Sequence, residues 1–333
     1  MTKSLPDTPI CLLDMGATFI RLLLFKPNSE RAPLSHLKVY KVADYPDLLA
    51  VLAEYAQKSG SDFKHIAVAT AAQKYADGLW RFHDGRVWMN TQSELEQAGY
   101  TTVLLTNDFE ATARGAMTLG KDELEMLSEG VFDKQLPRVV VGAGTGLGFA
   151  YISPTINSVP HVQLTYGGHM LATGLTDEQL LVISTLRTMR GAGGHSVVVE
   201  DLASGRAFQI LHNVVSRIHG LPQLEASAED IMKEPQEQVN ATVLRLFHEF
   251  LGLFLHGCIV NGHAFGGVYL DGGIITRLRE QGLLDVETIR RFMVLNPVDV
   301  VKEALEAVPL RLIDSPHVAL KGLQAFLEER HAA

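Results

Sequence analysis

The sequence predicts a two-domain α/β protein built around two strand–turn–strand units. Short apolar runs typical of buried strands alternate with amphipathic helical segments, which is the pattern of α/β folds. Apolar runs joined by a glycine-containing turn occur twice, around residues 10–25 and 138–152. The 333 residues suffice for two domains with substantial cores. Because the two units are alike in pattern and far apart in the chain, we expect a duplicated fold that holds a ligand between its halves.

The first unit comprises a predicted strand at Ile10–Leu13, a turn at Asp14–Thr18 and a returning strand at Ile20–Phe25. Leu37–Val42 is expected to add a third strand. Pro46–Gln57 has the apolar spacing of an amphipathic helix.

Two further strands are predicted before residue 110. Ile66–Ala69 is a short buried strand, and Thr102–Leu105 is another, which ends before a helix that begins near Phe109. Residues 119–137 are charged and poorly periodic, so we expect a surface connection or a short helix there.

The second unit has a strand at Arg138–Val141, a turn at Gly142–Gly146 and a returning strand at Leu147–Ile152. Thr176–Arg190 follows with a helical pattern, and the glycines at 191–194 end it. Its apolar positions include Leu180, Ile183 and Leu186.

Helices predominate in the last third of the chain. Glu200–Arg217 and Asn240–Val260 read as longer helices, and the second is apolar enough to be buried in a core. Val268–Leu270 is a short strand, and His317–Arg330 is a final helix. In that helix the residues spaced to face one core are Leu320, Leu323 and Phe326.

We place the domain boundary near residue 109. Residues 1–109 are expected to form a smaller α/β domain and 110–317 a larger one, with the helix at 318–333 folding back onto the first.

Composition argues against several classes of protein. The net charge of −9 is unlike the basic surface of a nucleic-acid-binding protein. Cys11 and Cys258 each lie in an apolar run, so we expect free thiols and a reducing, cytoplasmic location. The first nine residues are mostly polar and no signal-peptide core follows them. The longest apolar stretch, Phe250–Val260, is too short to span a bilayer, so no membrane insertion is expected.

The two turns have the composition of phosphate-binding loops. Glycine lets backbone N–H groups approach phosphate oxygens closely, and Gly142–Gly146 adds a hydroxyl at Thr145. Asp14 ends its strand where a carboxylate can hold Mg²⁺ directly or through water, and Thr18 offers a second hydroxyl. The alternative is that both are ordinary hairpin turns. A P-loop is not the explanation, because the stretch from Gly115 to Asp122 lacks the hydroxyl that binds Mg²⁺.

Asn107 and Asp108 stand at the end of a predicted strand, where a carboxylate can take a hydroxyl proton and an amide can bind a sugar. The alternative is that they cap the helix that follows, since both residue types are favoured at that position.

Together these motifs resemble the bacterial glucokinases of the actin/hexokinase superfamily. The similarity runs from about residue 10 to residue 325, and its long matches are at Gly142–Gly148 and Phe265–Ile274. The motifs, in family order, are Asp14-x-Gly16-x-Thr18, Asn107-Asp108-Phe109, Gly142-Ala143-Gly144-Thr145-Gly146-Leu147-Gly148, Gly167-Gly168-His169 and Phe265-Gly266-Gly267-Val268-x-x-x-Gly272-Gly273-Ile274. The resemblance implies the two-domain actin/hexokinase-like (ribonuclease H-like) fold, with a cleft that closes on the sugar.

The resemblance implies roles for individual residues. Asp108 would be the catalytic base for the sugar 6-hydroxyl, and Asn107, His169 and Glu200 would contact the sugar. The residues implied in Mg²⁺, phosphate and adenosine binding are Asp14, Gly16, Ala17, Thr18, Gly142, Ala143, Gly144, Thr145, Gly146, Gly272 and Gly273. Taken alone, Glu200 also fits a helix cap or a surface charge, and Gly272-Gly273 also fits a plain strand-to-helix turn.

The implied enzyme is a hexokinase-type phosphotransferase, a glucokinase that uses ATP and Mg²⁺ to convert glucose to glucose 6-phosphate in glycolysis. The implied partners are small molecules, the sugar and ATP, with a homodimer as the expected assembly.

The chain also departs from the family pattern. In the first turn Ala17 replaces a glycine and Phe19 an asparagine, and Tyr166 replaces a sugar-binding glutamate. A tyrosine hydroxyl can hydrogen-bond a sugar but is not a charged acceptor. The remaining departures are at Asp84-Gly85-Arg86 before Trp88, at Ser204-Gly205-Arg206-Ala207 and at Val318–Gly322. They leave open a kinase for another hexose or amino sugar, or a non-catalytic sugar- or nucleotide-binding regulator.

Overall fold

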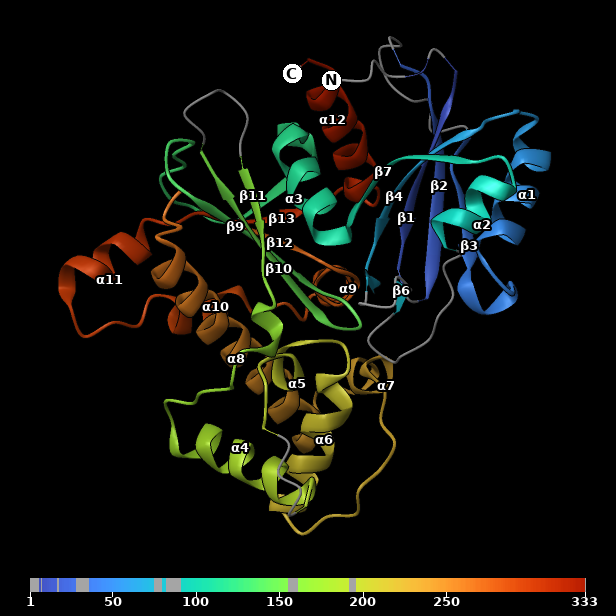
Figure 1. Ribbon diagram of the computed structural model, residues 1–333. Coiled ribbons are helices and arrows are strands. Elements are labelled where there is room, and N and C mark those ends of the chain that lie inside the picture. The colour runs from blue at the N-terminus through green and yellow to red at the C-terminus, as the bar shows by residue number, and fades with distance from the viewer. Residues whose placement is uncertain are drawn as a thin grey trace. The chain divides into compact units, whose positions relative to one another are not determined.

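The computed structural model describes residues 6, 8–16, 18–27, 36–74, 80–81, 91–154, 161–191 and 196–332. The chain divides into two compact units: unit 1 comprises residues 1–120 and 315–333, and unit 2 comprises residues 121–314. Each unit contains one mixed β-sheet (Figure 1).

The sheet of unit 1 has five strands in the order β3-β2-β1-β4-β7. Their bounds are β1 Ile10–Met15, β2 Phe19–Phe25, β3 Lys38–Lys41, β4 His65–Thr70 and β7 Thr101–Asn107. β1, β2 and β3 form an antiparallel meander, and β1, β4 and β7 run parallel. The predicted hairpin and the three further strands are thus confirmed. A separate pair, β5 (Gln73–Lys74) and β6 (Trp80–Arg81), is antiparallel.

Helices cover both faces of this sheet, because successive residues of a strand point to opposite sides. Cys11, Leu13 and Met15 of β1 pack with α1 (Leu48–Ser59). Ile10 and Leu12 lie in the other core, which α3 (Asp108–Thr118) and α12 (Val318–Ala332) cover. The short helices of unit 1 are η2 (Val42–Asp44) and α2 (Gln92–Gln97).

The inward residues predicted for the last helix are correct. Leu320 and Leu323 of α12 are buried, and Phe326 packs against the same core. In Figure 1, α12 lies beside α3, and the two glycines at their crossing, Gly115 and Gly322, have no space for a side chain.

The sheet of unit 2 has six strands in the order β11-β10-β9-β12-β13-β8. Their bounds are β8 Leu124–Ser128, β9 Arg138–Ala143, β10 Leu147–Ser153, β11 His161–Leu164, β12 Val268–Asp271 and β13 Leu310–Ile313. The first five strands in that order repeat the unit 1 pattern, an antiparallel β11-β10-β9 followed by parallel β9-β12-β13. The duplication expected from the two hairpins is confirmed at the level of topology.

One large apolar core fills unit 2. Its centre is α8 (Gln238–Gly262), a helix that is long and apolar enough to cross a membrane by those two criteria alone. However, 72% of its most apolar stretch is buried inside unit 2, as in a core helix. The other helices are η3 Lys121–Glu123, η4 Gly167–His169, α4 Asp177–Met189, α5 Glu200–Ala203, α6 Ala207–Ile218, α7 Ala228–Lys233, α9 Gly273–Glu280, α10 Val286–Met293 and α11 Asp299–Glu306.

Two predictions of secondary structure need correction. Residues 124–128 form the edge strand β8, where a surface connection or short helix was expected, because they pair with β13 far along the chain. The helix predicted at Glu200–Arg217 is broken into α5 and α6, since Gly205 N–H donates to Gly144 O at 2.7 Å.

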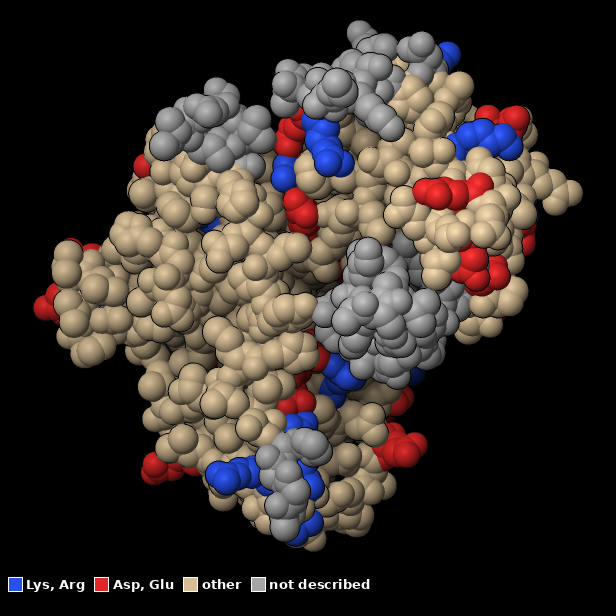
Figure 2. Space-filling model, viewed as in Figure 1, with Lys and Arg blue, Asp and Glu red and all other residues tan. Residues whose placement is uncertain are grey.

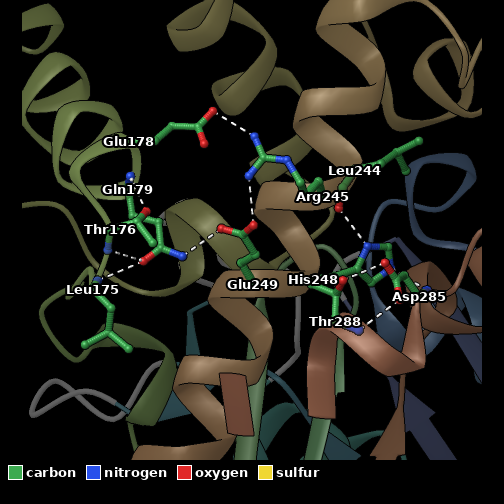
Figure 3. A network of polar contacts seen from close by, with 10 residues as sticks. All are labelled: Leu175, Thr176, Glu178, Gln179, Leu244, Arg245, His248, Glu249, Asp285 and Thr288. Atoms are coloured by element: carbon green, nitrogen blue, oxygen red, sulfur yellow. Dashed lines mark hydrogen bonds and ion pairs between the residues drawn. The ribbon is translucent and has the colours of Figure 1, made fainter. Parts of the chain in front are cut away.

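The inward face of α4 includes a buried polar residue. Leu180 is exposed and Gln179 is fully buried in its place. Gln179 Nε2 donates to Glu249 Oε2 of α8 at 2.7 Å, and its Oε1 accepts from Leu175 N–H at 2.8 Å (Figure 3). A polar side chain that has these partners can be buried without an unpaired group.

The surface carries charges of both signs. On the face in Figure 2, basic and acidic side chains are interspersed with wide uncharged areas. Cys11 and Cys258 are free and buried, as expected.

Candidate active site

The glycine turn of unit 2, Gly144–Gly146, projects from the β9–β10 hairpin. Gly144 N–H donates to Gly146 O at 2.9 Å, which closes the turn, and Thr145 is exposed at its tip. Gly142 and Ala143 lie in β9, buried and paired with Gly148 and Leu147. Of the five predicted phosphate residues, Gly144, Thr145 and Gly146 are therefore the ones accessible to a ligand.

Two other segments, at Gly205 and Gly272, contact the backbone of this turn directly. Gly205, between α5 and α6, donates its N–H to Gly144 O, and a Cβ there would lie 2.7 Å from that oxygen. Gly272, between β12 and α9, has φ of 105° and would overlap the Ala143 backbone if it carried a Cβ. Glycine is required at position 272 for both reasons. Gly273 begins α9 and is exposed beside it.

Glu200 is the third support. Its Oε2 accepts the Leu147 N–H, at the exit of the turn, at 2.8 Å, and its Oε1 pairs with the Arg206 guanidinium. A Cβ on Gly146 would lie 2.6 Å from the same Oε2. The structure thus places Glu200 against the glycine turn Gly144–Gly146.

Tyr166 precedes η4 and His169 is its last residue, and both are exposed on the surface of unit 2. Tyr166 is 64% exposed, and its ring centroid lies 6.3 Å from that of His169. Gly167 and Gly168 between them are buried, where a Cβ would overlap Phe149 and Leu147. The close packing of these glycines fixes the two polar side chains outside the core.

The first turn belongs to unit 1 and joins β1 to β2. Gly16 N–H donates to Phe19 O at 3.0 Å, and Thr18 O accepts from Val42 N–H at 2.9 Å. Ala17 lies outside the described residues. Phe19 is exposed at the start of β2, so the predicted asparagine-to-phenylalanine departure places an apolar ring at the surface.

Asp14 lies in a mixed electrostatic environment. Arg21, its partner across the hairpin, donates to Oδ2 at 3.0 Å. Burial raises the pKa of the Asp14 carboxyl above its ordinary value, and the positive charges of Arg21 and His317 oppose that rise. Burial and then Arg21 lower the pKa of His317, whose buried Nδ1 has no hydrogen-bond partner among the described residues.

Asn107 and Asp108 lie at the same edge of the unit 1 sheet as the Asp14 turn. In register, Met15 of β1 faces Thr70 of β4, which faces Asn107 of β7. Two strand spacings therefore separate the ends of β1 and β7, about 10 Å. Carboxyl ends of neighbouring parallel strands are where α/β folds bind ligands.

Asn107 caps α3, as the structural alternative expected. Its Oδ1 accepts the Phe109 N–H at 2.9 Å, and Asp108 Oδ1 lies 2.9 Å from the same nitrogen. The cap uses the oxygen of Asn107, and its amide nitrogen makes no hydrogen bond to the part of the chain that the structure describes, so it can donate two to a ligand.

A magnesium ion fits Asp14 on chemical grounds. Mg²⁺ in phosphate sites takes one or two carboxylates, phosphate oxygens and waters. Arg21 contacts Oδ2, which leaves Oδ1 to bind the ion or its water. Among the residues that the structure describes there is no cluster of three His, Cys, Asp or Glu side chains that could hold a metal, so the site would depend on the phosphates.

Sequence reasoning missed the basic partners of these carboxylates. The partners are Arg21 and His317 for Asp14, and Arg206 for Glu200. No local sequence pattern predicts them, because each pairing depends on how the chain folds around the carboxylate. Asp84-Gly85-Arg86 and Trp88 lie outside the described residues.

Known structures share this architecture. A glucokinase from an Antarctic psychrotroph matches with a TM-score of 0.78 at 22% identity, over 98% of this chain and 100% of that one. A ROK family glucokinase from Streptomyces griseus, in complex with glucose and AMPPNP, matches with a TM-score of 0.61 at 15% identity, over 96% and 99%. The fold is therefore the actin/hexokinase-like fold of sugar kinases.

The glucokinase family model matches residues 12–330, so the chain belongs to the glucokinase family. A glucokinase-like protein of Xylella fastidiosa is 28% identical over 335 residues, which cover 96% of this chain and 95% of that protein. The glucokinase of Psychromonas ingrahamii is 28% identical over 329 residues, with 95% and 96% covered. Family membership supports sugar kinase activity of the hexokinase type.

Proposed function

We propose that this protein transfers the γ-phosphoryl group of ATP to the 6-hydroxyl of glucose. The observation that carries the proposal is the placement of Asn107 and Asp108 at the same sheet edge as the Asp14–Thr18 turn. The proposed base, the proposed sugar-binding amide and a candidate Mg²⁺ ligand therefore lie at one edge of the unit 1 sheet. In unit 2, the glycine turn is held by hydrogen bonds from Gly205 and to Glu200.

In the proposed reaction Asp108 accepts the proton of the 6-hydroxyl as that oxygen attacks the γ-phosphorus and the bond to ADP breaks. Asn107 holds the same sugar through its free amide donors. Gly144, Thr145 and Gly146 receive phosphate oxygens, since a turn braced on three sides loses little freedom on binding. Mg²⁺, when bound through Asp14, would neutralise phosphate charge.

Residues of unit 2 supply the other proposed contacts. His169 and Glu200 bind sugar hydroxyls, and Tyr166 offers a phenol where a carboxylate was expected. Gly272 and Gly273 admit the adenosine, since Gly273 is exposed and has space around it. The free, buried thiols of Cys11 and Cys258 fit a reducing cytoplasm. The proposed assembly is a homodimer, and light scattering after size exclusion would measure its mass.

A second candidate is a kinase for another hexose or an amino sugar. Tyr166 favours it, because a neutral, exposed phenol donates and accepts one hydrogen bond and tolerates substituents that a carboxylate would not pair with.

A coupled assay for ADP release against a panel of hexoses and amino sugars tests both. Turnover with glucose above all other sugars supports the proposal, and turnover with another sugar supports the second candidate. Binding of sugar or ATP without any turnover would show a non-catalytic regulator. Asp108→Asn should lower kcat at least about a thousandfold while ATP still binds; unchanged kcat would remove Asp108 as the base.

A further inference from the structure

Glu200 ties the phosphate turn to the segment before α6. Its carboxylate bonds Leu147 N–H on one side and the Arg206 guanidinium on the other. The side chain of Glu200 is 12% exposed and that of Arg206 is 58% exposed, so the carboxylate is enclosed and the guanidinium faces solvent. Gly205, next to Arg206, bonds Gly144 O, and the same short segment thus contacts both the start and the exit region of the turn.

The pair also sets the charge beside the turn. Oε2 of Glu200 lies close to Gly146, so an uncompensated carboxylate there would repel a phosphate bound at the turn. Partly buried charges are screened less by salt than exposed ones. The guanidinium of Arg206 cancels that charge where the phosphate would bind.

From this geometry we infer that Glu200 and Arg206 are positioning residues for the anionic phosphoryl donor. Glu200 holds the exit of the turn, and Arg206 holds Glu200 and neutralises it. The inference rests on the proposed function, which assigns the turn to ATP. The carboxylate keeps lone pairs for a sugar hydroxyl, so the two roles are compatible.

Hydrogen–deuterium exchange of the ligand-free protein tests the support by Glu200. In Glu200→Ala, the amides of residues 142–149 should exchange about tenfold faster, because the Leu147 N–H loses its acceptor. Glu200→Gln keeps an acceptor oxygen and should stay near wild type. Glu229→Ala, which removes an exposed carboxylate paired with Lys233, is the matched control and should change nothing in the turn. If these amides exchange in Glu200→Ala at the wild-type rate, Glu200 does not hold the turn and this part of the inference is overturned.

ATP binding by calorimetry tests the charge. Arg206→Ala should weaken ATP binding about tenfold, because the bare carboxylate faces the phosphates. The double variant Glu200→Gln/Arg206→Ala should regain most of that affinity, because the amide carries no charge. If Arg206 only held the fold together, the double variant would bind no better than the single one, and that result would overturn the inference.

The two measurements separate this inference from the proposed function. If the wild type binds no ATP, the proposed function fails and amide exchange still decides whether Glu200 supports the turn. If the wild type binds ATP and Arg206→Ala binds it equally well, the role of Arg206 is overturned while the proposed function stands.

Discussion

Gly322 of α12 lies directly against the backbone carbonyl of Ala111 in α3, where a Cβ would overlap the oxygen. Gly115 of α3 makes the reciprocal approach, because its Cβ would overlap the Val318 carbonyl. Two glycines facing the opposite backbone let the helices pack closer than side chains would allow. The crossing fixes the position of α3, whose first residue is Asp108.

Gly322→Ala is therefore expected to lower the free energy of unfolding of unit 1 by about 1–3 kcal/mol, since the added methyl group must push the helices apart. Both tryptophans of the chain, Trp80 and Trp88, belong to unit 1. Tryptophan fluorescence during urea unfolding thus reports this unit selectively.

Gly257→Ala is the matched control, because Gly257 is also a helical glycine but has open space around it. Since Gly257 lies in unit 2, urea unfolding followed by circular dichroism, which reports the helices of both units, compares the two variants. Alanine is the better helix former by up to about 1 kcal/mol, so this change should be neutral or stabilising. Equal effects of the two substitutions would show that the helix crossing does not require Gly322.

The sequence predicted both hairpins because the information is local: apolar runs of strand length and a glycine turn between them. It could not predict β8, because an edge strand with charged neighbours is defined by its pairing with β13, nearly two hundred residues later. The break between α5 and α6 depends on a bond from Gly205 to Gly144, which is equally non-local.

The polar interior was also beyond sequence reasoning. Hydrophobicity alone would place Leu180, and not Gln179, on the inward face of α4. Gln179 is buried because Glu249 of another helix binds its amide, and a partner of that kind leaves no trace near residue 179. For the site, the chain showed which residues to consider, and the structure added Arg21 and Arg206 as their partners.

Gly272→Ala should destabilise unit 2 by about 2–4 kcal/mol, because φ of 105° and overlap with the Ala143 backbone both penalise a side chain. ATP affinity should fall as well, since the glycine turn that we propose to bind phosphate follows Ala143. Gly282→Ala is the control: its φ is 69°, but nothing lies near its Cβ, so it measures the backbone cost alone, about 1 kcal/mol. Urea unfolding followed by circular dichroism compares the two, and equal losses would contradict the overlap.

Glu249→Ala should cost about 2–3 kcal/mol, mainly because it strands the buried amide of Gln179. Arg245, the other partner in Figure 3, is 38% exposed and can return to water. The double variant Gln179→Leu/Glu249→Leu should regain part of the loss, because it removes the buried amide and the buried carboxylate together. The regain is partial because the N–H groups of Leu175 and Thr176 lose Gln179 Oε1 as their acceptor.

Glu306→Ala provides the comparison for Glu249. Glu306 pairs with Lys302 at 3.7 Å with both side chains half exposed, so its removal should change the free energy of unfolding by less than about 0.5 kcal/mol. A similar loss for Glu249→Ala and Glu306→Ala in urea unfolding would argue against the buried network.

His248 should make the protein sensitive to acid. Burial lowers the pKa of His248 to about 4, although its bond to Leu244 O and the charge of Asp285 oppose the shift. The neutral ring bridges α8 to Asp285 N–H through Nε2 at 3.3 Å. The unfolded chain takes up the proton near the ordinary value of 6.5, so protonation favours unfolding between pH 6.5 and 4.

The contribution of His248 is therefore complete above pH 6.5 and is lost as pH falls towards 4, up to about 3 kcal/mol. Urea unfolding of the wild type and of His248→Gln should be compared at about pH 8.0, 6.5 and 5.0. The difference between the two proteins isolates the contribution of His248, because the other titrating groups are common to both. The variant should be less stable at high pH, and the difference between the two proteins should narrow as the pH falls. A difference that is constant with pH would mean that the pKa of the ring is the same in the folded and unfolded states, which would contradict its burial as a neutral group.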